Sequence, residues 1–219
     1  MKFTQKELEE IEKQLSHPDG ENGLKIAENM NESNIQMTNS SIDSLSLLEQ
    51  DILLEIGHGN CGHLNKIFEK VKDIHYFGLE ISKTMKNEAE RINQKIIQKK
   101  HISFQEYDGN KIPFLNNSFN KIFTVNTIYF WKDPIAFLNE IHRVLKVNGI
   151  FVLTFSQKGF MKKLPFVKEK FSLYNDEDLR QIIEKTNLKI IEIINKTDKV
   201  KSKTGDLVNR EYSVVIMGN

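Results

Sequence analysis

The sequence predicts an α/β fold, with a doubly wound and mostly parallel sheet of seven strands that ends in an antiparallel hairpin and carries an N-terminal helical extension. Three observations support this fold class. An apolar segment at 52–56 stops at a glycine-rich turn, 57–62, and strand and helix patterns alternate from there on. Near the C-terminus, two strand patterns are joined by a polar segment without a helix. Alternation of strand and helix favours parallel strands with right-handed crossovers, and strands joined without a helix are most simply antiparallel.

The first 50 residues contain few apolar residues that could build a core of their own. Residues 3–15 place apolar side chains at helical spacing and predict a short amphipathic helix. Residues 24–30 could add one or two helical turns. Residues 29–46 are rich in Asn and Ser, and we expect a loop that runs into a helix ending near Gln50. We therefore interpret residues 1–50 as a helical cover over the main domain, and residues 51–219 as that domain.

The main domain shows a regular order of strand and helix patterns. Strands are expected at 52–56, 74–81, 102–107, 121–125, 150–155, 189–195 and 211–217. Helices are expected at 62–72, 83–99, 134–146 and 176–186, and the third of these has one apolar face at a helical period. Asn148-Gly149 supplies a turn into the following strand, and a basic loop covers 158–170.

Bulk properties exclude several classes of protein. The chain has 219 residues, with 31 basic and 30 acidic side chains and a net charge of +1, which gives no general field for nucleic acid. One cysteine excludes an internal disulfide framework and fits a reducing compartment. The N-terminus has no apolar signal region, and no apolar run reaches the ~20 residues of a membrane helix. These properties predict a cytoplasmic protein without membrane insertion.

The glycine-rich turn indicates a nucleotide-type site. Gly57-x-Gly59-x-x-Gly62 fits the dinucleotide-binding pattern, and the acid Glu80 follows at the end of the next strand. Glu55 lies inside the first strand, where a lone buried carboxylate is costly. An acid at this position favours a ligand that carries positive charge or presents hydrogen-bond donors.

Residues 55–59, Glu-Ile-Gly-His-Gly, resemble the first motif of the class I S-adenosylmethionine-dependent methyltransferases, usually acid-x-Gly-x-Gly-x-Gly. The seven-stranded plan, Rossmann-like and closed by a hairpin, is similar to theirs, so the resemblance covers residues 51–219. Residues 119–134 and 141–149 resemble small-molecule methyltransferases related to those of ubiquinone and menaquinone biosynthesis. The resemblance implies in-line transfer of a methyl group from S-adenosylmethionine to a small molecule, leaving S-adenosylhomocysteine.

The resemblance also implies a set of cofactor-binding residues at the carboxyl ends of the first four strands: Glu55, Gly57, Gly59, Asn60, Cys61, Glu80, Ile81, Asp108, Gly109 and Asn126. Glu80 is expected to accept hydrogen bonds from the ribose, although it could instead cap the next helix, a role open to Ser82. Asp108 resembles the residue that accepts from the adenine amino group, and its alternative is an Asp-Gly turn. Cys61 replaces the last glycine of the motif and is expected to enlarge the loop toward the methionine part.

The sequence indicates no definite catalytic base and no metal site. Tyr129 is the one candidate base, and a base is needed only if the acceptor loses a proton. Tyr129 and Trp131 are candidates for the acceptor pocket, with core aromatics as the alternative. His58 is expected to be a loop residue and not a base, and Cys61 a small packing residue and not a nucleophile. The identity of the acceptor and the oligomeric state stay open.

Two other functions remain at this point. A nicotinamide-dependent oxidoreductase would use the same glycine turn, but Glu55 and the terminal hairpin argue against it. A non-enzymatic RNA-binding module is suggested by runs of lysine at 158, 162, 163, 168, 170, 199, 201 and 203. Charge runs are usually solvated faces, aromatic stacking residues are sparse among these lysines, and we expect no nucleic acid partner.

Overall fold

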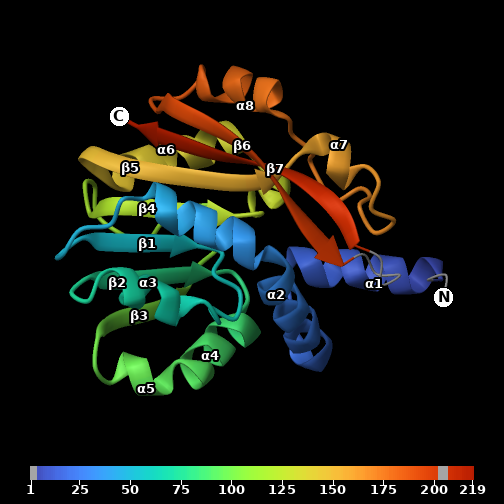
Figure 1. The fold of residues 1–219 in the computed structure, drawn as a ribbon, viewed down its shortest axis with the longest axis horizontal. Helices are drawn as coiled ribbons and strands as arrows, with labels where there is room; N and C mark the ends of the chain where they lie inside the picture. The colour runs from blue at the N-terminus through green and yellow to red at the C-terminus, as the bar shows by residue number, and fades with distance from the viewer. Residues whose placement is uncertain (1–3, 202–206) are drawn as a thin grey trace.

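A single seven-stranded sheet forms the centre of the molecule in the computed structural model, which describes residues 4–201 and 207–219. The strand order is β3-β2-β1-β4-β5-β7-β6 (Figure 1). The strands are β1 Ile52–Ile56, β2 His75–Glu80, β3 His101–Glu106, β4 Phe119–Val125, β5 Leu145–Ser156, β6 Lys189–Lys201 and β7 Leu207–Gly218. The predicted fold class is confirmed.

The first five strands are parallel, and β7 pairs antiparallel with both β5 and β6. β5 begins earlier than expected, because Leu145 already pairs with Phe119 before a register shift in β4. The hairpin strands are also longer than their apolar cores predicted, since β6 and β7 stay paired as far as Lys201 and Leu207. The long hairpin thus extends beyond the carboxyl ends of the parallel strands (Figure 1).

Helices cover both faces of the sheet. They are α1 Gln5–Ser16, α2 Gly20–Ser44, α3 Leu64–Lys70, α4 Lys83–Ile92, α5 Gln94–Ile97, α6 Pro134–Val144, α7 Lys158–Met161 and α8 Asp176–Ile183, with a 3-10 turn, η1, at Ile128–Phe130. The single helix expected over 83–99 is divided at Asn93, whose side-chain amide donates to the carbonyls of Ala89 and Cys61. That contact joins the end of α4 to the glycine-rich loop.

Two buried clusters fill the space between the helices and the sheet. One contains η1, α6 and α8 and is centred on aromatic residues of β4 and β5, such as Phe119 and Phe155. The other lies on the opposite face and contains α3, α4 and the end of α2, with Tyr76 and Phe123 at its centre. The two clusters thus pack on both faces of the sheet, and the carboxyl ends of the strands are left for contacts with other parts of the chain.

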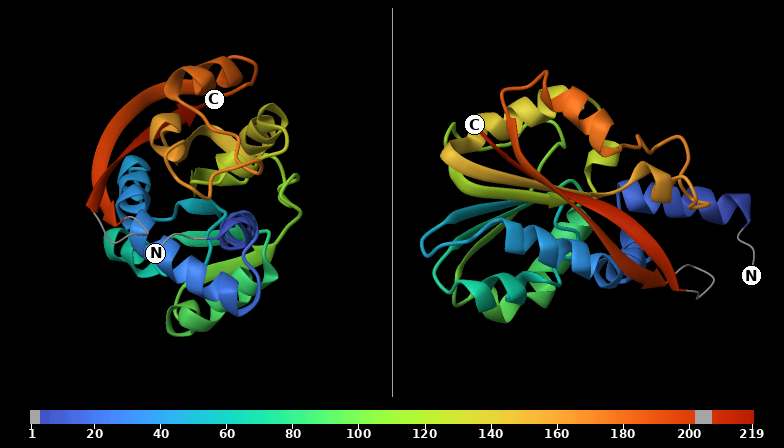
Figure 2. Two further views of the ribbon diagram at one scale, coloured as in Figure 1. Left: turned by 90° about the vertical axis from the view of Figure 1, so that its right-hand side faces the viewer. Right: turned by 45° about the horizontal axis from the view of Figure 1, so that its top comes forward.

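The N-terminal region differs from the prediction. The expected loop over 29–46 is wrong, because α2 is one continuous helix of 25 residues. Its second half packs against β4, β5 and β7, and Met37, Ile42 and Leu45 are at most 1 % exposed. This half of α2 is therefore part of the core, while α1 and the first half of α2 lie across the carboxyl ends of the strands (Figure 2, left).

Buried polar contacts explain why the composition of α2 was misleading. The Ser41 hydroxyl donates to the carbonyl of Met37 and to Thr154 Oγ1 in β5, at 2.9 and 2.7 Å. Ser40 shares a hydrogen bond of 3.0 Å with the hydroxyl of Tyr212 in β7. Serine is a weak helix former in isolation, but here its hydroxyls are partners for polar groups of the sheet. None of the described helices has the length and apolar character needed to span a bilayer.

We predict that Ser41→Ala lowers the free energy of unfolding by ~1–3 kcal/mol, because the buried hydroxyl of Thr154 loses its partner. Urea denaturation followed by circular dichroism measures this change. Ser44→Ala, in the same helix but without a side-chain hydrogen bond among the described contacts, is the matched control. Equal stability of the two variants would show that the contact between α2 and β5 contributes little.

Candidate active site

The loop after β1 brings its backbone close to the end of β2. Gly57 has φ +71°, and a Cβ there would lie 2.5 Å from Thr127 Cγ2, so a side chain is excluded. Gly59 has φ +57°, and a Cβ there would meet no atom within 4 Å. The first glycine is thus required by packing, and the second leaves open space above the loop.

Glu80 joins this loop to the end of β2. Its Oε2 accepts from the Gly59 amide at 2.9 Å, and its Oε1 accepts from the amides of Ile81 and Ser82 at 2.8 and 3.2 Å. Ser82 caps α4 by accepting from Met85 N, so Glu80 is not needed as the cap. The carboxylate is 5 % exposed and lines a cavity at the strand ends.

Glu55 is buried and already paired. Its Oε2 lies 2.9 Å from His63 Nε2 and accepts from the Tyr76 hydroxyl at 2.5 Å. Burial opposes ionisation of the carboxyl, but the adjacent His63 outweighs it, and the net effect is a lowered pKa. These partners were not predicted from the sequence; His63 precedes α3 and Tyr76 lies in β2. Glu55 is therefore not a lone acid, although it still borders the cavity.

The expectation for the direction of Cys61 is wrong. Cys61 has φ +51°, and its fully buried side chain packs in the core with Sγ 3.2 Å from the Tyr76 hydroxyl. Ligand atoms of Glu55, Cys61 and His63 lie within 4.8 Å of one another, an arrangement that could hold a metal ion. Burial and then the Glu55 charge raise the pKa of the thiol well above its usual range, and the Tyr76 hydroxyl contacts both Cys61 and Glu55. Hydrogen bonding accounts for this cluster.

Asp108 lies at the surface and outside the cavity lining. Its carboxylate accepts from the amides of Asn110 and Lys111 at 2.8 Å, and these contacts lower its pKa. This is the Asp-Gly turn considered as the alternative to adenine binding. Its neighbours Tyr107 and Gly109 do line the cavity, and so does Ile81.

Asn126 and the aromatic residues after β4 complete the rim. Asn126 has φ +57°, and its Oδ1 accepts from Ser156 N at 3.1 Å and from the Tyr129 hydroxyl at 3.0 Å. The Tyr129 hydroxyl also lies 3.0 Å from the Ser156 carbonyl, and burial raises its pKa. The environment of Tyr129 therefore suits a residue that positions Asn126 more than a base. Trp131 is 9 % exposed and lies against Phe137, and both Tyr129 and Trp131 border the cavity.

These residues face one large cavity of about 1590 Å³. Its lining includes ten of the twelve predicted site residues: Glu55, Gly57, Gly59, Asn60, Glu80, Ile81, Gly109, Asn126, Tyr129 and Trp131. Cys61 and Asp108 are not part of it. The cavity continues beneath α1, the first half of α2 and the loop after α7. The wall formed by the loop after α7 was not predicted from the sequence.

Comparison with known proteins places this chain in a family. A family model described as a methyltransferase domain matches residues 54–153. YrhH of Bacillus subtilis, a protein assigned as a methyltransferase, is 30% identical over 141 residues, which cover 64% of this chain and 75% of YrhH. The chain belongs to the class I S-adenosylmethionine-dependent methyltransferases.

Two solved structures share the fold of this methyltransferase. A SAM-dependent methyltransferase from Aquifex aeolicus has a TM-score of 0.65 and 17% identity, with 98% of this chain and 99% of that chain covered. A methyltransferase from Haloferax volcanii, solved in complex with the Trm112 activator, has a TM-score of 0.72 and 16% identity, covering 88% of this chain and 93% of that one. At these identities the likeness concerns the fold.

His58 is the unusual residue of the methyltransferase's glycine loop. Its Nδ1 lies 2.8 Å from the Gly59 carbonyl, its ring packs on Phe104, and the residue is 5 % exposed. Among the described residues, His58 Nε2 is the only buried side-chain nitrogen or oxygen without a hydrogen-bond partner. Burial lowers the pKa of His58, and the attraction of Glu80 only partly offsets this. The imidazole is thus held neutral.

We predict that the stability of this methyltransferase falls as the pH is lowered below about 6.5. Below this usual pKa of histidine the unfolded chain binds a proton at His58, whereas the folded state with its lowered pKa does not. The slope contributed by one such group is at most about 1.4 kcal/mol per pH unit. His58→Gln should flatten the dependence measured by thermal unfolding between pH 7.5 and 5.5, and exposed His17→Gln should not. Identical slopes for all three proteins would contradict the prediction.

Proposed function

We propose that this methyltransferase transfers a methyl group to a small-molecule acceptor, with the donor bound at the carboxyl ends of β1, β2 and β4 and the acceptor in the cavity under α1 and α2. The supporting observation is the buried Glu80 carboxylate, held by three backbone amides at the edge of that cavity. A carboxylate has about four acceptor sites, and the three amides occupy three of them, so Oε2 keeps one site that can accept from a ribose hydroxyl.

Other residues have supporting roles. The open space at Gly59 can hold the methionine part, and Gly109 and Ile81 border the place expected for adenine. Asp108 lies outside the cavity lining and its Oδ1 is held in the turn, so we assign the adenine edge to its neighbours. Glu55 acts through its pairing with His63, which keeps a negative charge near the sulfonium end.

The chemistry needs alignment more than acid or base groups. A lone pair of the acceptor forms a bond to the methyl carbon while the carbon–sulfur bond breaks, and sulfur keeps that electron pair as the neutral thioether. An acceptor atom that carried a proton releases it to solvent or to a group of its own. The protein holds the two reactants in line and excludes water. Tyr129 contributes by fixing Asn126 at the rim.

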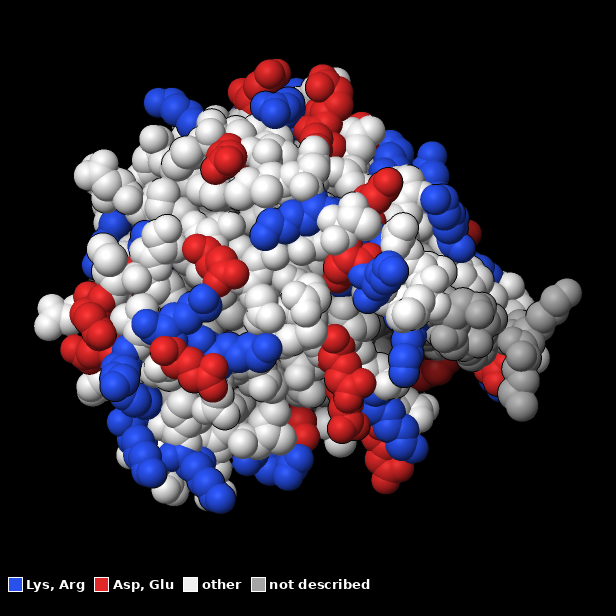
Figure 3. Space-filling model, in the orientation of Figure 1, with Lys and Arg blue, Asp and Glu red and all other residues white. Residues whose placement is uncertain are grey.

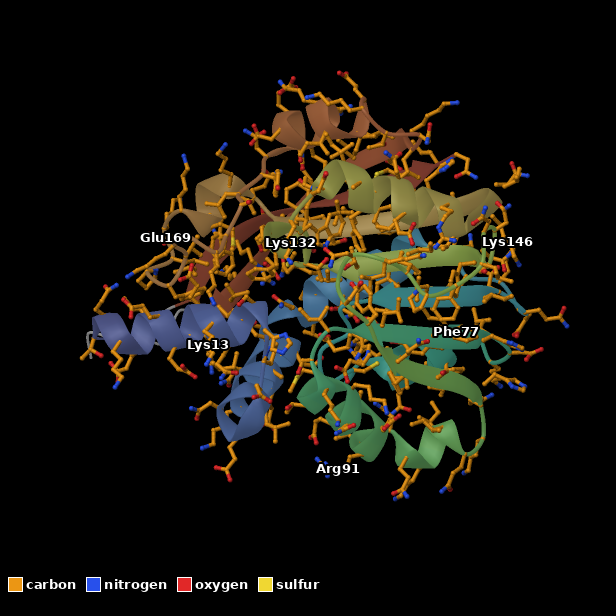
Figure 4. All side chains as sticks on the ribbon, turned by 180° about the vertical axis from the view of Figure 1, so that it is seen from behind. Lys13, Phe77, Arg91, Lys132, Lys146 and Glu169 are labelled. Carbon is orange, nitrogen blue, oxygen red and sulfur yellow. The ribbon has the colours of Figure 1, made fainter. Side chains whose placement is uncertain are left out.

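The N-terminal segment supports a small acceptor. Pro18 and Asp19, between α1 and α2, accept hydrogen bonds from Ser82 and Thr84, directly after Glu80. On the other side, Glu12 of α1 accepts from the Lys170 amide at 2.9 Å. Figure 4 shows α1, where Lys13 is labelled, beneath the loop that carries Glu169. A segment tied on both sides covers the cavity and leaves little room for a macromolecule.

We predict that Glu80→Ala weakens binding of S-adenosylmethionine and S-adenosylhomocysteine by ~1.5–3 kcal/mol, the scale of hydrogen bonds to a charged group. Isothermal titration calorimetry measures it, with NAD as a third ligand that should not bind. Glu106→Ala is the matched control, because Glu106 pairs with Glu80 in the β2–β3 register but is exposed and outside the cavity. An affinity of Glu80→Ala equal to that of the control would refute the ribose assignment.

We predict that removal of residues 1–16 exposes Trp131, the only tryptophan in the chain. Leu8 and Leu15 of α1 line the same cavity as Trp131, so acrylamide should quench the indole fluorescence more strongly without α1. Glu12→Ala, which removes the contact to Lys170, should give an intermediate increase, and exposed Lys13→Ala none. Unchanged quenching after the deletion would mean that α1 does not cover the acceptor side.

A further inference from the structure

The cavity is larger than one ligand needs. Pockets for single small molecules are commonly ~300–1000 Å³, and this one is about 1590 Å³. The glycine loop, Glu80 and Asn126 border only one end of it. The remaining volume lies against α1, α2, η1, the loop after α7 and the ends of the β6–β7 hairpin.

The walls of this remaining part are mainly apolar. They include Leu15 of α1, Met30 of α2, Phe130 of η1, and Met161, Leu164 and Phe171 from the α7 region. The Phe130 and Phe171 rings lie 4.8 Å apart and form one side. The buried cation of this part is already paired, because Arg210 contacts Asp198 at 2.7 Å and donates to Asn34 and the Ser33 carbonyl of α2.

Lysines border the apolar part. Lys163, Lys199 and Lys201 line the cavity and are exposed, and none has an ion-pair partner among the described residues. Of the lining carboxylates, Glu55, Glu80 and Asp198 are hydrogen-bonded, which leaves Glu32 without a described partner. Three unpaired lysines face one free carboxylate, in a chain whose net charge is only +1. Basic side chains gather near α7, at the upper right of the molecule in Figure 3.

We infer that the acceptor is an amphipathic anion, with an elongated apolar body in the chamber under α1 and α2 and a carboxylate or phosphate group near Lys163, Lys199 and Lys201. The apolar walls supply affinity in proportion to the area buried, and the lysines favour a negative end near the opening. A neutral apolar molecule would leave the lysines without a partner, and a short anion would leave the walls empty. This inference rests on the proposed function, because it assigns the other half of the same cavity.

The test uses calorimetry on the full chain saturated with S-adenosylhomocysteine, with ligands kept below their critical micelle concentrations. The ligands are hexanoate, octanoate, decanoate, decyl phosphate and neutral 1-decanol. We expect the affinity of the carboxylates to rise about fourfold per methylene group, and both ten-carbon anions to bind more tightly than 1-decanol. The tighter of the two anions then identifies the charged group. Trp131 fluorescence provides a second signal from inside the cavity.

The lysine contribution is tested with Lys199→Glu/Lys201→Glu, and separately with Lys163→Glu in case the double variant folds poorly. Each should weaken decanoate about 3- to 10-fold, since exposed ion pairs are weak, and leave 1-decanol unchanged. Lys95→Glu/Lys99→Glu carries the same charge change on two exposed positions, one in α5 and one just after it, and should behave like the parent.

The inference would be overturned by an affinity that is independent of chain length, or by equal losses in the cavity variants and in Lys95→Glu/Lys99→Glu. Absence of amphiphile binding by a protein that binds S-adenosylhomocysteine would refute this inference alone. Failure to bind S-adenosylhomocysteine would instead refute the proposed function.

Discussion

The hydrogen bonds of Glu80 connect the parts of the site that lie far apart in the sequence. One carboxylate oxygen accepts from Gly59 in the loop after β1, and the other accepts from the amides that lead into α4. Because these amides already donate to the Glu80 carboxylate, their positions are fixed before a ligand binds. The contact holds the loop after β1 against the end of β2, directly before Ser82 and Thr84, which donate to the Pro18–Asp19 turn. The Glu80 carboxylate can be buried because backbone amides donate hydrogen bonds to it. These donors lose no side-chain entropy when the contacts form.

Much of the sheet was predictable because its signals are local. Apolar runs, a glycine turn and an Asp108-Gly109 turn each depend on a few neighbouring residues, and they placed all seven strands. The partners of Glu55 were not predictable, since His63 and Tyr76 reach it from different segments. The direction of Cys61 was also hidden. With φ +51°, Cys61 points its side chain toward the core and not, as the motif had suggested, toward the methionine part.

Helix α2 shows how tertiary packing overrides the structure that local amino-acid composition predicts. Asn and Ser favour caps and turns in isolated chains because their side chains compete for backbone groups. In α2 those same side chains find partners on β5 and β7, with Ser41 bonded to Thr154 and Ser40 to Tyr212. A helix whose buried face is polar lacks the hydrophobic periodicity of an amphipathic helix, and its sequence therefore predicts a loop. Its complement lies on strands more than a hundred residues away.

The energetics of the cover differ between its two ends. The second half of α2 and the residue that follows it bury Met37, Ile42 and Leu45 in the core, and full burial of such side chains is worth roughly 1.5–3 kcal/mol each. The Pro18–Asp19 turn and Glu12 are held mainly by single hydrogen bonds, each with a net value of about 0.5–1.5 kcal/mol. Any opening that admits ligands therefore costs least if α1 and the first half of α2 move while the second half stays in place. Helix α2 thus completes the core with its second half, and its first half, together with α1, forms the most weakly held wall of the cavity.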